Sequence, residues 1–183
     1  ALNPSNPKSR DEWTTFGCPE LARASGKFYY EMEFLSYFNN PQVGFLRTSA
    51  KPEEFGSKKG VGDTEVGWAL NGQRQVFWHN GEHEPLEMDM PWEKGDVIGV
   101  AVNLDAGEMQ WRSHGGSVTK AFQCQGEMYP AVSIRGFFRL HLARSTWQLQ
   151  PPDDHQEWSQ GQGDLGDFSW TSSLVGEGLE ESL

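Results

Sequence analysis

Two acidic residues, two positions apart, are the first feature of this sequence that could perform chemistry. Glu31 and Glu33 would project from the same face of a strand, because side chains alternate along a strand. Glycosidases use such a pair as an acid and a base or nucleophile, about 5–10 Å apart in a sugar cleft. The Glu-x-Asp-x-x-Glu signature of sandwich-fold glycosidases is absent here. Glycoside hydrolysis is therefore not expected.

A second cluster combines imidazole and carboxylate groups that could attract a metal ion. His79, Glu82, His83 and Glu84 lie around the turn Asn80-Gly81. The pattern predicts no helix that would fix their spacing as a metal site needs. Cys-x-x-Cys pairs, which indicate structural zinc, are also absent. We expect a solvated turn and no metal site.

The other candidates for catalysis lack their sequence context. Ser113 and Ser133 stand outside any Gly-x-Ser-x-Gly motif, and no cysteine–histidine nucleophile pair is evident. The segment Gly60-Val61-Gly62-Asp63 has neither the Lys-Ser/Thr nor the following helix of a phosphate-binding loop. We predict no catalytic residue and no cofactor, and therefore a protein that is not an enzyme.

Basic and aromatic residues concentrate instead in two connections between predicted strands, and loops are where binding residues are common. An arginine can form two hydrogen bonds to a carboxylate, and an aromatic ring can anchor in a partner's pocket. The residues predicted to contact a partner are Arg47, Lys51, Phe55, Lys58, Lys59, Arg135 and Phe137. The alternative is a solvated basic loop, with Phe138 in the core by strand alternation.

The elements that must position these residues are short strands. Lys27–Leu35 carries an aromatic or apolar side chain at every second position from Phe28 to Phe34, the pattern of a half-buried strand. Asn71-Gly72 and Asn80-Gly81 predict tight hairpin turns, because both residue types tolerate positive φ. The strand candidates are 27–35, 42–46, 67–70, 75–79, 96–104, 108–113, 128–134 and 137–143. Many short strands without an amphipathic helix predict an all-β sandwich or barrel.

Several motifs, in this order, resemble the SPRY domain family over about residues 26–143. The segment Gly95–Asp105 is the most specific match. The chain departs from the family pattern at His114-Gly115-Gly116, where the family often has Asn-Gly, which affects only the expected type of that turn. The other matching motifs are Gly26–Glu33, Val43-Gly44-Phe45, Gly67-Trp68, Trp78-His79-Asn80-Gly81, Met109-Gln110-Trp111 and Tyr129-Pro130-Ala131-Val132-Ser133.

This resemblance implies a two-sheet antiparallel β-sandwich of the jelly-roll type, which binds partner proteins through loops at one end. Catalysis is not the usual role of the family. The loop after Val43-Gly44-Phe45 and the loop after Tyr129–Ser133 correspond to family loops that contribute to partner binding. They hold the basic and aromatic residues named above.

The chain is expected to have three parts. Residues 1–25 are predicted to be an N-terminal arm that packs on the sandwich through Trp13 and Phe16, residues 26–150 the SPRY-like sandwich, and residues 151–183 an acidic extended tail. The tail has eight acidic residues and no lysine or arginine, and the family offers no counterpart to it. Since aromatic side chains are costly to leave in water, we predict docking of Trp158, Phe168 and Trp170 on the domain or on a neighbour.

Charge excludes two classes of partner. The formal net charge is −11, and the first 150 residues hold 18 acidic and 15 basic residues. Neither part has the basic stripe that nucleic-acid backbones or anionic membranes require. Apolar runs such as Val97–Val102 are too short to span a bilayer. We expect neither a nucleic-acid partner nor direct membrane insertion.

The predicted function is that of a non-catalytic interaction module that binds a partner protein or peptide. Because the predicted binding loops are basic, an acidic partner is favoured. One alternative is a structural subunit, held in a larger multiprotein assembly by the arm and the tail. A lectin-like, carbohydrate-binding domain is the less favoured alternative.

The compartment is expected to be intracellular and cytoplasmic. The first residues do not form a signal peptide. The chain lacks an initiator methionine, so the sequence leaves open that a leader or a preceding domain has been removed and that the protein lies in an organelle. The two cysteines, Cys18 and Cys124, are expected to be free thiols in a reducing compartment, although the sequence leaves their pairing open.

Overall fold

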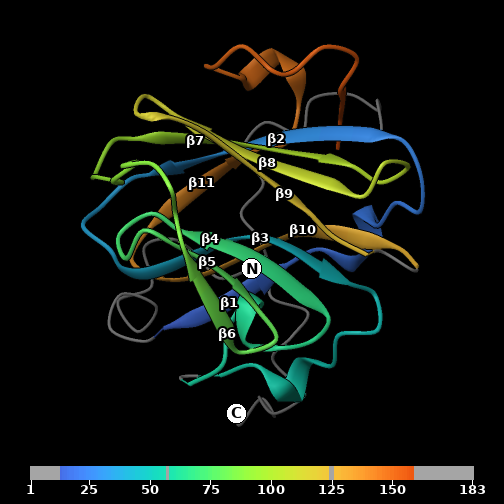
Figure 1. Ribbon diagram of the computed structural model, residues 1–183, viewed down its shortest axis with the longest axis horizontal. Helices are drawn as coiled ribbons and strands as arrows, with labels where there is room; N and C mark the ends of the chain where they lie inside the picture. The colour runs from blue at the N-terminus through green and yellow to red at the C-terminus, as the bar shows by residue number, and fades with distance from the viewer. Residues whose placement is uncertain (1–12, 57, 124–125, 159–183) are drawn as a thin grey trace, which may run out of the picture.

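The chain folds into two β-sheets that pack face to face (Figure 1). The computed structural model describes residues 13–56, 58–123 and 126–158. The first sheet has the strand order β1 (Thr14–Gly17), β10 (Met128–Arg135), β3 (Asn39–Arg47), β4 (Gly67–Asn71), β5 (Val76–His79) and β6 (Glu82–Pro85). The second has the order β11 (Phe138–His141), β2 (Lys27–Phe34), β7 (Val97–Asn103), β8 (Glu108–Ser113) and β9 (Gly116–Ala121).

The remaining regular elements are small. The strand β12 (Gln156–Glu157) pairs in parallel with β2. The part of the chain that the structure describes also contains four 3-10 turns: η1 (Pro19–Leu21), η2 (Pro52–Glu54), η3 (Val61–Asp63) and η4 (Arg144–Thr146). No helix within the described residues is long and apolar enough to cross a membrane. The predicted all-β fold, a two-sheet antiparallel sandwich, is confirmed.

β2 shows how the alternating pattern builds the core. Its residues Phe28, Tyr30, Met32 and Phe34 are at most 7% exposed and belong to the main hydrophobic cluster. The hydroxyl of Tyr30 donates a hydrogen bond of 2.8 Å to the carbonyl of Gly44 on β3, so a polar tip in the core is satisfied across the two sheets.

The two Asn-Gly hairpins turn out differently. Asn80 and Gly81 have φ angles of 53° and 73° and join β5 to β6 in the predicted tight turn. The β4–β5 connection is longer, because Asn71 pairs with Val76 and residues 72–75 form the turn. Gly72 lies against the indole of Trp92, where a Cβ would come within 2.2 Å of the ring. The predicted hairpin between these two strands is therefore present, and it turns over four residues, with Gly72 packed against Trp92.

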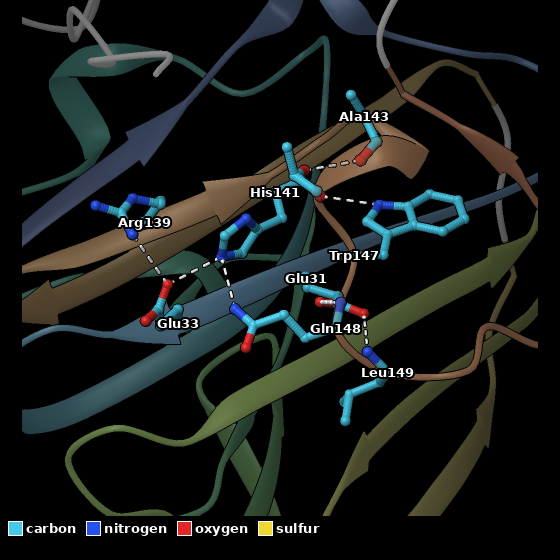
Figure 2. A network of polar contacts seen from close by, with 9 residues as sticks. Glu31, Glu33, Arg139, His141, Ala143, Trp147, Gln148 and Leu149 are labelled. Atoms are coloured by element: carbon cyan, nitrogen blue, oxygen red, sulfur yellow. Dashed lines mark hydrogen bonds and ion pairs between the residues drawn. The ribbon is translucent and has the colours of Figure 1, made fainter. Parts of the chain in front are cut away.

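The outer face of β2 is buried as well, because residues 143–158, here called the strap, cross the second sheet at the top of Figure 1. Trp147 packs edge-on against Tyr29, with ring centroids 4.7 Å apart. The carboxylate of Glu31 accepts hydrogen bonds from the backbone N–H groups of Gln148 and Leu149, at 2.7 and 2.8 Å (Figure 2). The strap is therefore held by both ring packing and charge-assisted hydrogen bonds.

The strap ends in the core. Trp158 is fully buried, and its ring lies 4.9 Å from that of Phe28 and 6.0 Å from that of Phe45. Its backbone N–H donates to the carbonyl of Leu142 at 3.2 Å. Residues 151–158 of the predicted tail thus pack as part of the sandwich. Phe168 and Trp170, the other two residues predicted to dock, lie outside the described residues.

The described part of the N-terminal arm is also built into the sandwich. β1 pairs antiparallel with β10 at the edge of the first sheet. Phe16 is 8% exposed and meets the half-buried ring of Phe138 edge-on at 5.2 Å. The indole N–H of Trp13 donates to the carbonyl of Asn40 at 2.9 Å. These contacts place the arm beside the loops at the start of β3.

Cys18 has a free thiol, which donates a hydrogen bond of 3.1 Å to the carboxylate of Glu20, while Cys124 lies outside the described residues. Burial, and then the neighbouring Glu20 carboxylate, raise the pKa of the Cys18 thiol to about 12. At pH 8 roughly one such thiol in 10⁴ is a thiolate, against about a quarter for a pKa near 8.5.

Iodoacetamide is therefore expected to alkylate Cys18 at least about 100-fold more slowly in the folded protein than in urea, because the thiolate is the nucleophile. Mass spectrometry of the peptide that contains Cys18 measures both rates. Glu20→Gln should increase the folded-state rate. Equal rates in the folded and unfolded protein would contradict the expectation.

Candidate partner-binding site

A hollow of about 450 Å³ lies at one end of the first sheet. Antiparallel pairing brings the start of β3 and the ends of β4 and β10 to this end, as the register between Asn39 and Arg135 shows. The residues that line the hollow are Trp13, Asn39, Asn40, Gln42, Lys58, Asp63, Asn71, Arg74, Trp78 and Arg135. We call it the basic hollow.

Positive charge dominates this hollow. Lys58, Arg74 and Arg135 are exposed, and among the described residues none of the three forms an ion pair. Among the described lining residues the single carboxylate is that of Asp63, which already accepts hydrogen bonds from the Gln42 amide at 3.1 Å and from the Gly60 N–H at 2.8 Å. The guanidinium of Arg74 lies over the Trp78 ring, 5.1 Å from its centroid. The hollow therefore offers cations to a ligand, with few carboxylates to compete.

A buried polar network holds the wall of the basic hollow in place. The hydroxyl of Ser133 accepts the N–H of Val61 at 2.9 Å and lies 2.7 Å from the hydroxyl of Thr15. The side-chain oxygen of Gln42 accepts the N–H of Gly62 at 2.8 Å. Gly62 lies against Trp78, where a Cβ would come within 2.3 Å of the Trp78 Cβ. Ser133 is fully buried. Together with the segment Gly60-Val61-Gly62-Asp63, it supports the loop that carries Lys58.

A comparison with known proteins identifies this sandwich. The family model of the SPRY domain matches residues 27–143, most of the described chain. The chain belongs to the SPRY domain family. SPRY domains are protein-interaction modules that are generally not catalytic. The predicted resemblance and the interaction role at this level are confirmed.

The SPRY domain also resembles part of a larger protein. It is 33% identical over 135 residues to the E3 ubiquitin-protein ligase RKP of Arabidopsis thaliana. The match covers 70% of this chain and 10% of that ligase. The ligase is thus far longer than the segment that it shares with this chain.

The SPRY fold brings together only some of the residues predicted to contact a partner. Lys58 and Arg135 line the basic hollow, whereas Arg47 lies at the far end of β3, with its guanidinium 4.8 Å from the centroid of the Trp68 ring. Lys51 and Lys59 are exposed on the same loop as Lys58 but do not line the hollow.

The two aromatic residues that were predicted to contact a partner make contacts within the domain. Phe55 is half-buried and packs on the smaller hydrophobic cluster beneath the β3–β4 loop. Phe137 is also half-buried, and its N–H donates to the Ser36 hydroxyl at 2.8 Å while its carbonyl accepts the Leu35 N–H at 2.9 Å. Neither residue lines the basic hollow.

Several lining residues of the SPRY hollow were missed in the sequence. Arg74 lies in the β4–β5 turn, and Asn39 and Asn40 begin β3. The only signal for them was the Asn-Asn-Pro and Asn-Gly composition of two turns. Their convergence on Arg135 depends on strand register, which the sequence does not state.

The residues first considered for chemistry hold the SPRY sandwich together. Glu31 is fully buried beneath the strap, and Glu33 pairs with Arg139 at 3.3 Å and with His141 at 3.0 Å (Figure 2). His79 stacks on Trp68 at 4.6 Å. Within the described residues, no group of three or more His, Cys, Asp or Glu side chains is arranged to hold a metal ion.

Proposed function

We propose that this SPRY domain binds a partner protein through the basic hollow and recognises a carboxylate-bearing segment of that partner. The observation that carries the proposal is that Lys58 and Arg135, which come from loops far apart in the sequence, line one hollow together with Arg74. An arginine can form paired hydrogen bonds with a carboxylate, and such pairs strengthen when a partner excludes water from them.

Other lining groups suit a peptide ligand. Asn39 and Asn40 are exposed and carry amides that can donate to and accept from a peptide backbone. Trp13 and Trp78 provide rigid aromatic surface at the edges of the hollow, the type of residue enriched where binding energy concentrates. The proposed location is intracellular, as is typical of SPRY proteins.

The similarity to part of a ubiquitin ligase favours one setting for this module. In this proposal the domain contributes recognition to a larger protein or assembly, and any transfer of ubiquitin is carried out by other segments or subunits. The short match, 10% of the ligase, supports a role in binding rather than in the reaction.

Reversal of the two charges in Lys58→Glu/Arg135→Glu is expected to weaken partner binding at least about 100-fold, because two attractive contacts become repulsive. Peptides would be selected from a displayed random library on the immobilised full chain and should be rich in Asp and Glu. Fluorescence anisotropy would then compare the affinity of one selected, labelled peptide for the native chain and for the variant.

Lys51→Glu/Lys59→Glu is the matched control, since it makes the same change of net charge on exposed positions of the same loop that do not line the hollow. The affinity of this control variant for the selected peptide should stay within about fivefold of that of the native chain. The difference between the two affinities should shrink at high salt. Equal losses in the two variants, or an undiminished affinity of the Lys58/Arg135 variant, would rule out this site.

A further inference from the structure

A second hollow, of about 680 Å³, lies away from the basic hollow and shares no lining residue with it. β3 runs from one to the other, with Asn39 and Asn40 at the basic hollow and Arg47 at the second. Lys120 of β9 reaches Glu84 of β6 at 2.7 Å, so the hollow lies where the edge strands of the two sheets approach each other. We call it the acidic mouth.

Aromatic rings form one wall of the acidic mouth. Trp68, Phe77, His79 and Phe122 all line it. Trp68 and His79 are stacked, with centroids 4.6 Å apart and planes 7° from parallel, and Phe122 lies 5.5 Å from Trp68. Trp68 and Phe77 are buried, so the ring surface that a flat or cationic group can contact belongs to the half-buried His79 and Phe122.

His79 is fixed in an orientation that leaves one acceptor. Its Nδ1 lies 2.8 Å from the carbonyl oxygen of Gly67. Because a carbonyl oxygen can only accept, Nδ1 carries the proton, and in the neutral ring Nε2 remains an acceptor. The neutral ring can therefore accept one further hydrogen bond, and His79 is one of the residues that line the mouth.

Carboxylates line the mouth beside these rings. Glu65, Glu82 and Glu84 are all exposed lining residues. Glu84 pairs with Lys120, whereas Glu65 and Glu82 form no ion pair with any described residue. Two carboxylates are therefore left to balance a charge brought by a partner.

Two cations of the chain already use the aromatic wall. The Arg47 guanidinium lies 4.8 Å from the centroid of the Trp68 ring and donates to the Gln123 carbonyl at 2.7 Å. The Lys120 ammonium lies 5.5 Å from the centroid of the Phe77 ring. These contacts show that rings of this wall attract both a guanidinium and an ammonium group, and they leave His79 and Phe122 to a cation brought by a partner.

We propose that the acidic mouth is a second protein-binding site, which takes an arginine or lysine side chain from a basic segment of a partner. The cation would lie beside His79 and Phe122, paired with Glu65 and Glu82. The volume suits a long side chain with its flanking backbone, since ligand pockets are typically about 300–1,000 Å³. The domain then has two sites of opposite charge preference, which select different segments.

The test uses the full chain and a fluorescein-labelled octapeptide of alternating arginine and serine. The matched peptide has citrulline in place of each arginine, which keeps the shape and removes the charge. Fluorescence anisotropy at low salt should show saturable binding of the arginine peptide, with the citrulline peptide at least about tenfold weaker. Glu65→Gln/Glu82→Gln should weaken the arginine peptide at least about tenfold, since charge-assisted contacts are lost.

Three control variants distinguish binding in the acidic mouth from attraction of the peptide to acidic residues elsewhere on the chain. Glu53→Gln/Glu54→Gln removes two exposed carboxylates outside both hollows and should change the affinity by less than about twofold. Neutralising Asp164, Asp167, Glu177, Glu180 and Glu181 removes the acids of residues 159–183 and should change it by less than about threefold. Lys58→Glu/Arg135→Glu, which tests the basic hollow, should leave it undiminished.

The proposal fails if the native chain shows no saturable binding or if the citrulline peptide binds equally well. It also fails if either set of control carboxylates accounts for as much of the affinity as Glu65 and Glu82. The changes from carboxylate to amide are nearly isosteric, and Lys58 and Arg135 are exposed, so thermal unfolding should be unchanged in each variant. Any variant that melts earlier would be replaced by its single substitutions.

Discussion

Trp158→Ala is expected to lower the free energy of unfolding by about 3–5 kcal/mol, the usual range for removal of a buried tryptophan ring. The substitution should be measured by urea unfolding, followed by far-UV circular dichroism, with an unchanged dependence on urea concentration. This residue lies well after the end of the SPRY family match at residue 143.

The reason for so large an effect is the position of the ring. Trp158 is fully buried against Phe28 and Phe45, which belong to opposite sheets. Its removal would leave a cavity between the sheets, and it would weaken the short parallel pairing of β12 with Phe28 and Tyr29. Core packing cannot close such a gap without shifting both sheets.

Trp147→Ala is the matched control in the same strap. Trp147 is only half-buried, so the loss should be about half as large. A loss below about 1 kcal/mol for Trp158→Ala would show that the strap is dispensable. The sandwich would then end near residue 143, as the family match alone suggests.

The long inner strands could be predicted from the sequence because most of their side chains are apolar and buried. β2 and β7 carry long apolar patterns, and both lie inside the second sheet. The edge strands β6 and β9 were not predicted. All four residues of β6 are exposed, and β9 has no fully buried residue, so neither has an apolar period that could reveal it.

The candidate site was predictable only in part, for a related reason. Lys58 and Arg135 stood out because they are basic and lie in loops that the SPRY resemblance points to. Arg47 stood out equally, but its side chain faces Trp68 at the other end of β3. Composition identifies loops that can bind, whereas the register of β3, β4 and β10 decides which loops meet.

Glu31→Gln is expected to lower the free energy of unfolding by about 2–3 kcal/mol. Glu31 is fully buried and accepts three hydrogen bonds, from the Tyr29 hydroxyl at 2.9 Å and from the N–H groups of Gln148 and Leu149 at 2.7 and 2.8 Å. A glutamine keeps one oxygen but turns an NH₂ group toward a backbone N–H, so one buried donor loses its partner.

Glu33→Gln is the matched control, two positions along the same strand. Its carboxylate is 22% exposed and contacts the side chains of Arg139 and His141, of which Arg139 can turn to water. The loss should stay below about 1 kcal/mol, as for partly exposed ion pairs. Both values would come from urea unfolding of full-length variants.

The comparison decides what the two carboxylates of β2 do. If Glu31→Gln lowers the free energy of unfolding much more than Glu33→Gln does, the two carboxylates hold the strap on the sheet, and the buried Glu31 contributes most of their stabilisation. Hydrogen exchange should then also show faster exchange at Gln148 and Leu149, because their N–H groups lose an acceptor or a well-aligned one. Equal small losses would mean that the packing of Trp147 and Trp158, with the pairing of β12, suffices to keep residues 143–158 on the sheet.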